Sequence, residues 1–194
     1  MNEFLNNAYN FIMYLISSSV IFGPIFACIL IFFESLLPIL PLFVFITIVF
    51  IAYGYVVGFI ISYILTSLGC FFSFYLFRKV FKSVVDKKLR SHDKINTLMK
   101  KIDKLDLSYL VLLIAIPFTP AFLVNIAAGL SKMKFKRFAV AIIIGKIFLV
   151  GFWGFIGTSL VESLKNPKIM LVIAIMLLVA YICSKIVSKK LELE

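Results

Sequence analysis

Four polar residues lie within long apolar stretches of this chain, and their types define the chemistry available there. Lys146 stands eight residues into an otherwise apolar run, and Glu34 separates two uncharged runs. A lysine at the centre of a membrane helix costs about 2.5–3.5 kcal/mol on insertion scales, so a compensating partner is expected. Thr119 followed by Pro120 is typical of a helix N-cap and first turn, where free N–H groups and the positive dipole end favour phosphate. Asn125 offers an amide one to two turns further on, and together these residues predict a site for a lipid headgroup or another anion.

Each of these residues also has a purely structural explanation. The long Lys146 side chain could reach the cytoplasmic headgroups, and Glu34 could simply mark the membrane interface. Thr119 and Asn125 could satisfy backbone groups of their own segment. The functional alternatives are an anion contact for Lys146, and either proton exchange or pairing with a cation for Glu34. The sequence alone leaves both sets of explanations open.

The composition restricts the kind of protein that can hold such a site. Apolar residues make up 63% of the chain, with 20 basic and 9 acidic residues and a net charge of +11. This composition indicates an integral membrane protein with a single domain over residues 1–190. The segment 78–106 alone holds ten basic and four acidic residues, so the charge is concentrated rather than dispersed. We interpret it as a topology signal and an anionic-lipid contact, and not as a nucleic-acid surface.

One uncharged stretch has basic residues on both sides. Residues 107–131 form 25 uncharged positions, enough to cross a bilayer at about 1.5 Å per residue. Three lysines precede this stretch, and three lysines and an arginine follow it. Such basic clusters mark the cytoplasmic side of a membrane. Pro117 and Pro120 interrupt the middle, and Gly129 would allow the turn out of the second half-helix. We therefore expect a re-entrant hairpin over 107–131 that returns to the side it left.

A second interrupted stretch precedes it in the chain. Residues 35–77 are 43 uncharged positions, too many for one helix. Pro38 and Pro41 break its start, so a re-entrant hairpin over about 34–53 followed by a span is expected. Two Pro-x-x-Pro segments at corresponding places predict an inverted repeat of the kind found in transporters.

The complete prediction is an all-α integral membrane protein, a small helical bundle with two facing re-entrant hairpins in an inverted repeat. Counting basic clusters places both termini in the cytoplasm and the protein in the cell membrane. The segment 78–106 would be cytoplasmic and amphipathic, with a helix at 94–105 lying on the anionic leaflet. The expected membrane spans are about 11–33, 55–77, 138–161 and 169–184.

Several chemistries find no support in the sequence. Cys28, Cys70 and Cys183 lack paired spacing and are expected to act as small apolar residues rather than metal ligands. His92 is expected to be solvated. No carboxylate, His or Cys cluster lies in the apolar stretches, so we expect no enzyme, no metal and no cofactor. The oligomeric state is left open, a homo-oligomer included.

Three segments together resemble a known family. Glu34-x-x-x-Pro38-x-x-Pro41, then Gly69 through Phe77-Arg78, then Pro117-Phe118-Thr119-Pro120 with Asn125 and Gly129, resemble the DedA superfamily, which has the VTT (SNARE-associated Golgi protein) domain. The resemblance covers roughly residues 20–160 and looks closer to the Golgi-type bacterial branch. It implies movement of membrane lipids, with phosphatidylethanolamine or undecaprenyl phosphate as substrates. Eukaryotic relatives are similar to phospholipid scramblases.

The resemblance also implies roles for individual positions. Glu34 matches the acidic residue that opens the first hairpin, and Pro117 matches the proline of the second. Many members have an arginine three residues before that proline, where this chain has Ile114. Lys146 is our candidate for the missing cation, and this departure leaves the phosphate-specific versions of the function open.

Three functions remain for the structure to address. The first is a lipid translocase, flippase or scramblase-like, that moves a phospholipid or polyprenyl phosphate headgroup between the hairpin tips. The alternative is a proton-coupled transporter of a small solute in which Glu34 exchanges the proton. A third is a non-transporting organiser of membrane proteins that acts through the amphipathic helix at 94–105.

Overall fold

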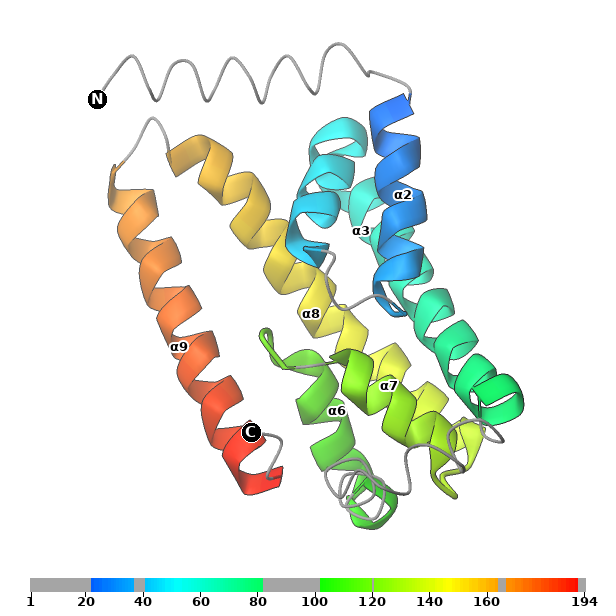
Figure 1. The fold of residues 1–194 in the computed structure, drawn as a ribbon. Helices are drawn as coiled ribbons and strands as arrows, with labels where there is room; N and C mark the ends of the chain where they lie inside the picture. The colour runs from blue at the N-terminus through cyan, green and yellow to red at the C-terminus, as the bar shows by residue number, and fades with distance from the viewer. Residues whose placement is uncertain (1–21, 37–40, 82–101, 120, 164–166, 192–194) are drawn as a thin grey trace.

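The structure, a computed structural model, describes residues 22–36, 41–81, 102–119, 121–163 and 167–191. Within these ranges every regular element is helical (Figure 1), which confirms the predicted all-α class. The elements are α2 (Phe22–Glu34), α3 (Leu42–Leu76), the π-helix η1 (Phe77–Phe81), α6 (Leu107–Ala115), α7 (Ala121–Leu130), α8 (Phe135–Ser163) and α9 (Pro167–Leu191). Three described segments are long and apolar enough to cross a membrane, namely Leu42–Val80, Phe135–Leu160 and Lys168–Val187.

Helix α3 consists of two arms joined at Gly54. Gly54 has φ 78° and ψ 171°, a conformation that is essentially restricted to glycine. The chain therefore folds back, so that the first arm (42–53) runs beside the second (55–76) in the opposite direction (Figure 1). Gly58 makes this possible, because a Cβ there would lie 2.7 Å from Phe50 Cα. Gly54 thus provides the turn, and Gly58 provides the close approach of the two arms.

The first hairpin is formed by α2, which ends at Glu34, and by the first arm of α3, which begins at Leu42. Its position corrects the predicted 34–53 boundaries, since Glu34 ends the first helix instead of opening the hairpin. Pro41 precedes the first helical residue of α3, so the proline region marks the tip, while Gly54 supplies the return turn. Pro38 lies outside the described residues. Helix α2 has 13 residues, about 20 Å of rise, which is less than the roughly 30 Å of a bilayer core.

The second hairpin is formed by α6, a break at residues 116–120, and α7. Phe118 at its tip has φ 66°, an uncommon conformation for a non-glycine residue. Pro117 is buried at the same tip, and Pro120 lies outside the described residues. The two hairpins enter the bundle from opposite ends, and their tips approach the middle of α8 (Figure 1).

Helix α8 is the element on which the hairpins assemble. It packs against α3 and α6, while α9 packs chiefly on α8. Apolar side chains form one core around α3, α6, α7 and the start of α8, and another around α2, α3 and Trp153. The close approaches use glycine, as at Gly157, where a Cβ would collide with Thr47.

The predicted spans 55–77, 138–161 and 169–184 fall on the second arm of α3, on α8 and on α9. Residues 11–21 of the first predicted span, and residues 82–101 of the amphipathic segment, including His92, lie outside the described residues. At the described end of that segment Ile102 is buried in the core with residues of α6, α7 and α8, and Lys104 is exposed.

Candidate functional site

Lys146 is buried in the middle of the bundle. Its side chain is 1% exposed, although it sits on a long apolar helix. This burial contradicts the explanation in which the lysine extends to the headgroup region. A buried ammonium needs polar partners, because removal from water costs several kcal/mol. The neighbouring elements supply them.

Glu34 lies close enough to Lys146 for the lysine charge to act on its carboxyl group. Glu34 occupies the last turn of α2, and Lys146 belongs to α8. The carboxyl group therefore lies in the electrostatic field of a buried cation. Since 112 positions separate the two residues in the chain, their proximity is a product of the hairpin geometry.

Asn125 connects the two hairpins. Its amide Nδ2 donates to the Ser35 carbonyl oxygen at 3.4 Å and to Cys70 Sγ at 3.5 Å, and the residue is 1% exposed. Cys70, fully buried on α3, also lies within the electrostatic field of Lys146 and Glu34. Glu34, Ser35, Cys70, Asn125 and Lys146 thus form one polar cluster contributed by four helices.

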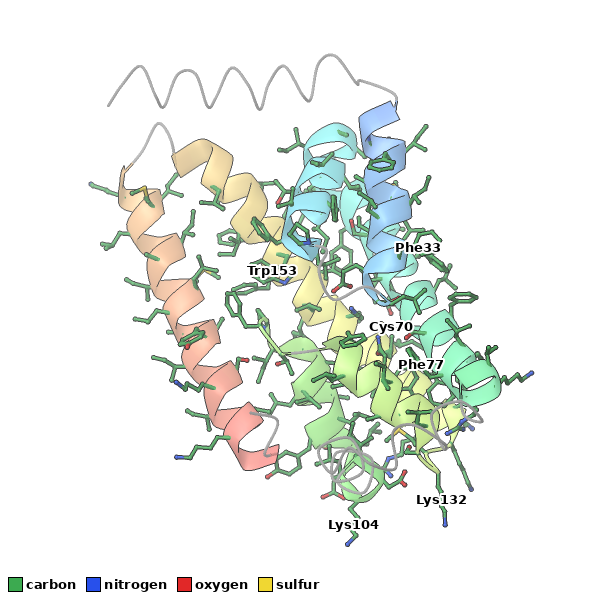
Figure 2. The ribbon with its side chains drawn as sticks, in the orientation of Figure 1. Phe33, Cys70, Phe77, Lys104, Lys132 and Trp153 are labelled. Atoms are coloured by element: carbon green, nitrogen blue, oxygen red, sulfur yellow. The ribbon has the colours of Figure 1, made fainter. Side chains whose placement is uncertain are left out.

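Cys70 was missed by the sequence reasoning, which treated it as a small apolar residue. Its position in the interior is visible in Figure 2. It lies next to Gly69, whose missing side chain lets α3 contact the Phe32 carbonyl and the Ser35 hydroxyl of α2. The adjacent Gly69 and Cys70 were the sequence signal that could have indicated this close contact between helices.

Aromatic rings hold the two tips against α8. Phe118 of the second tip contacts Trp153 edge to face, with ring centroids 5.4 Å apart. Phe43, at the start of the first arm of α3, also contacts Trp153, with ring centroids 5.6 Å apart. Trp153 lies at this level in Figure 2, well away from Lys104 and Lys132 at the basic end. One indole therefore sets the separation of the tips.

Thr119 differs from its predicted capping role. Its buried Oγ1 finds no hydrogen-bond partner within the described part of the chain, so it does not cap a described N–H of α7. The hydroxyl stands immediately before α7 at the tip of the second hairpin. A buried hydroxyl with unused bonding capacity there is available to a bound polar group.

Arg78 is a further residue that the sequence reasoning did not assign. Its Nε donates to the Gly129 carbonyl at 3.0 Å, and Nη2 donates to the carbonyls of Ala128 at 3.2 Å and Ser131 at 2.7 Å. The guanidinium also lies 4.4 Å from the Phe74 ring centroid. These carbonyls belong to the C-terminal end of α7, where a cation is favoured. Arg78 therefore fixes the helix that presents Asn125.

Gly129 does not have the predicted turn role. It lies within α7, and the only described glycine with positive φ is Gly54. A Cβ at Gly129 would lie 2.9 Å from the Phe74 carbonyl, so the glycine serves close packing of α7 on α3.

Ile114 is buried at the position where an arginine was expected from the resemblance. It packs on Gly145, the residue before Lys146, and a Cβ on that glycine would lie 2.7 Å from Ile114 Cγ2. An apolar side chain thus fills this contact, while the cation of the cluster comes from the next position of α8.

A family model described as the VTT domain matches residues 37–159. The chain belongs to the VTT-domain family. An uncharacterized membrane protein of Bacillus subtilis strain 168, YhjE, is 30% identical over 173 residues, covering 89% of this chain and 84% of the relative. No solved structure matches the chain.

The VTT-domain match confirms the resemblance to the DedA superfamily and identifies a membrane protein. The matched range includes Cys70, Arg78, Asn125 and Lys146. It begins after Glu34 and ends before α9, so the carboxylate of the cluster lies outside it. Among the described residues no group of three or more His, Cys, Asp and Glu could hold a metal ion.

Proposed function

We propose that this VTT-domain protein translocates lipids across the cell membrane, taking the polar headgroup between the two hairpin tips while the hydrocarbon chains stay in the bilayer. The observation that supports this most is the buried cluster of Glu34, Asn125 and Lys146 at the meeting point of the tips. A charge buried at this depth requires a polar partner, and a transient headgroup can be that partner.

The polarity of the cluster fits a phosphate-bearing headgroup. Lys146 supplies the cation, and Asn125 and Thr119 supply uncharged donors. Phosphatidylethanolamine and undecaprenyl phosphate both have the required phosphate. In the resting state Glu34 neutralises Lys146, and a headgroup phosphate exchanges with this carboxylate. The pairing therefore makes the site selective for ligands able to compete with a carboxylate.

In this proposal both hairpins are re-entrant, and the basic end of the molecule faces the cytoplasm. Lys104, Lys132 and Lys136 are exposed at or near that end, in agreement with the cytoplasmic preference of basic residues. The unfavourable placement of broken helices at membrane depth is tolerated because they are enclosed by α3 and α8.

The proposal is tested by lipid translocation in proteoliposomes with labelled phosphatidylethanolamine and a labelled polyprenyl phosphate, each compared with empty liposomes. We expect Lys146→Met, which removes the charge and keeps most of the volume, to slow the polyprenyl phosphate at least tenfold and more than phosphatidylethanolamine. Lys136→Met, an exposed lysine on the same helix, is the matched control and should be unchanged. Movement no faster than in empty liposomes, from folded wild-type protein, would refute the proposal.

Proton-coupled transport of a small solute is the second candidate, and the Glu34–Lys146 pair is the observation that favours it. A carboxylate paired with a lysine can release a proton when a ligand occupies the lysine. In this case Glu34→Gln should abolish solute flux driven by a pH gradient and leave lipid movement intact. Loss of lipid movement in the same variant would favour the translocase.

A further inference from the structure

An apolar groove lies between α6, α8 and α9. Its volume is about 580 Å³, within the range of small-molecule sites. The lining includes Val111, Ile116 and Pro117 from the second hairpin, Phe148 from α8, and Ile175 and Val179 from α9. The groove therefore extends along α6 as far as the hairpin tip.

The groove is distinct from the polar cluster. Phe148 and Phe152, which line it, follow Lys146 by two and six residues. At 3.6 residues per turn both positions fall on the side of α8 opposite Lys146. Helix α8 thus separates the two sites, and a molecule in the groove does not occupy the headgroup position proposed above.

The groove extends toward the basic side of the molecule. The ring of Phe118 at the hairpin tip meets that of Tyr181 with centroids 6.3 Å apart, which connects α9 with the second hairpin. Ser108, near the start of α6, lines the end toward the basic side. Figure 1 shows that the start of α6 and the end of α9 lie at the same end of the bundle. The shape fits a flexible hydrocarbon chain that enters near Ser108.

The charges near the Ser108 end of the groove favour a lipid with an anionic headgroup. Lys185 and Lys189 are exposed on α9 just beyond Cys183, and Lys104 is exposed shortly before α6 begins. Lysines near a membrane surface attract anionic lipids. We propose that the groove binds one chain of an anionic phospholipid, which fills the space between α6 and α9 and places its phosphate among these lysines.

The bound lipid would act as a support for the second hairpin. Helix α9 packs chiefly on α8, so in the described structure few direct contacts connect it to α6. A hydrocarbon chain in the groove contacts both helices and the tip at Pro117. Occupancy should therefore stabilise the fold whether or not the protein translocates lipids.

The test uses the full-length protein in phosphatidylcholine nanodiscs with a small fraction of phosphatidylglycerol that has a photoreactive group in its acyl chain. Mass spectrometry of the cross-linked peptides maps the contacts. Adducts should concentrate on groove-lining residues of α8 and α9, and Val179→Trp should lower their yield at least fivefold. Ile182→Trp, an exposed residue of α9 that does not line the groove, is the matched control and should leave the yield unchanged.

Competition with unlabelled lipid tests the headgroup. Phosphatidylglycerol should displace the probe at a concentration at least fivefold lower than phosphatidylcholine, and Lys185→Gln with Lys189→Gln should reduce this preference. Adducts spread evenly around α9, or a yield unaffected by Val179→Trp in protein of unchanged thermal stability, would overturn the groove site. Equal competition by the two lipids would overturn its anionic specificity. Translocation measured on the same samples is a separate readout, so failure of the groove and failure of the proposed translocase are distinguishable.

Discussion

The two hairpins meet at one polar cluster, but they are held in place by different means. The first hairpin is held by backbone contacts that only glycine allows, at Gly58 against Phe50 and at Gly69 against the end of α2. The second is held at its base by the Arg78 side chain, which binds three carbonyls at the end of α7. Glycine contacts therefore dominate in the first hairpin, whereas the second combines a glycine contact at Gly129 with one particular side chain, Arg78.

The difference indicates how each hairpin responds to change. Glycine contacts between helices are rigid, because any added atom collides with backbone. Hydrogen bonds from a partly exposed guanidinium have no such steric limit, because the long side chain can follow a shift of the helix end. The first hairpin is therefore expected to be a fixed wall of the site, and the second to be the part that can move when a headgroup enters.

The largest stability effect is expected at Arg78. Arg78→Ala removes three charge-assisted hydrogen bonds to buried helix-end carbonyls, and such losses total about 2–4 kcal/mol. Arg78→Lys should recover only part of this, because an ammonium cannot reproduce the planar fork. Thermal unfolding in detergent measures both variants. Equal stability of wild type and Arg78→Ala would contradict the capping role.

A smaller loss is expected at Gly54 in the first hairpin. A Cβ atom there would meet nothing within 4 Å, so Gly54→Val chiefly tests the backbone conformation, worth about 1–3 kcal/mol. Gly151→Ala is the matched control, since its Cβ would make an ordinary contact at 3.8 Å with Phe59. Thermal unfolding should separate the two variants. A Gly54→Val protein as stable as the control would show that the return turn is not strained by a side chain.

The smallest stability effect is expected at Asn125, where the two hairpins touch. Asn125→Ala removes two long hydrogen bonds, at 3.4 and 3.5 Å, and should cost about 1 kcal/mol. Its effect on lipid translocation should exceed its effect on unfolding, because the amide belongs to the headgroup site. Both measurements on the same sample, with Asn125→Ser as a polar comparison, decide between the two roles. Loss of stability alone would assign Asn125 to packing.

The charge pattern of the sequence was sufficient to predict two interrupted helical segments and several residues of the site. Lys146, Glu34 and Asn125 were predicted because polar groups are unfavourable in apolar stretches, and the structure brings all three together. Their roles toward a ligand remain a prediction. Pro41 and Pro117 lie between described helices, where interruptions were predicted, whereas Pro38 and Pro120 lie outside the described residues. The re-entrant placement of both hairpins stays a prediction.

The residues missed by sequence reasoning depend on contacts between distant parts of the chain. Arg78 caps a helix whose end lies about 50 positions later, and the Cys70 thiol acquires polar neighbours only when α7 and α8 pack on α3. Gly129 was assigned a turn from local propensity, yet its role comes from the carbonyl of Phe74. Local patterns describe what a segment can form, and tertiary packing decides which of its atoms are used.

The peripheral position of α9 has a consequence for biogenesis. Glu34, Cys70, Arg78, Asn125 and Lys146 all precede α9 in the order of synthesis, and α9 packs chiefly on the outside of α8. All residues of the polar cluster are therefore present in the chain before α9 is added. A released chain that ends at Ser163 would still contain the whole cluster, so docking of α9 can follow as a separate, later step of assembly.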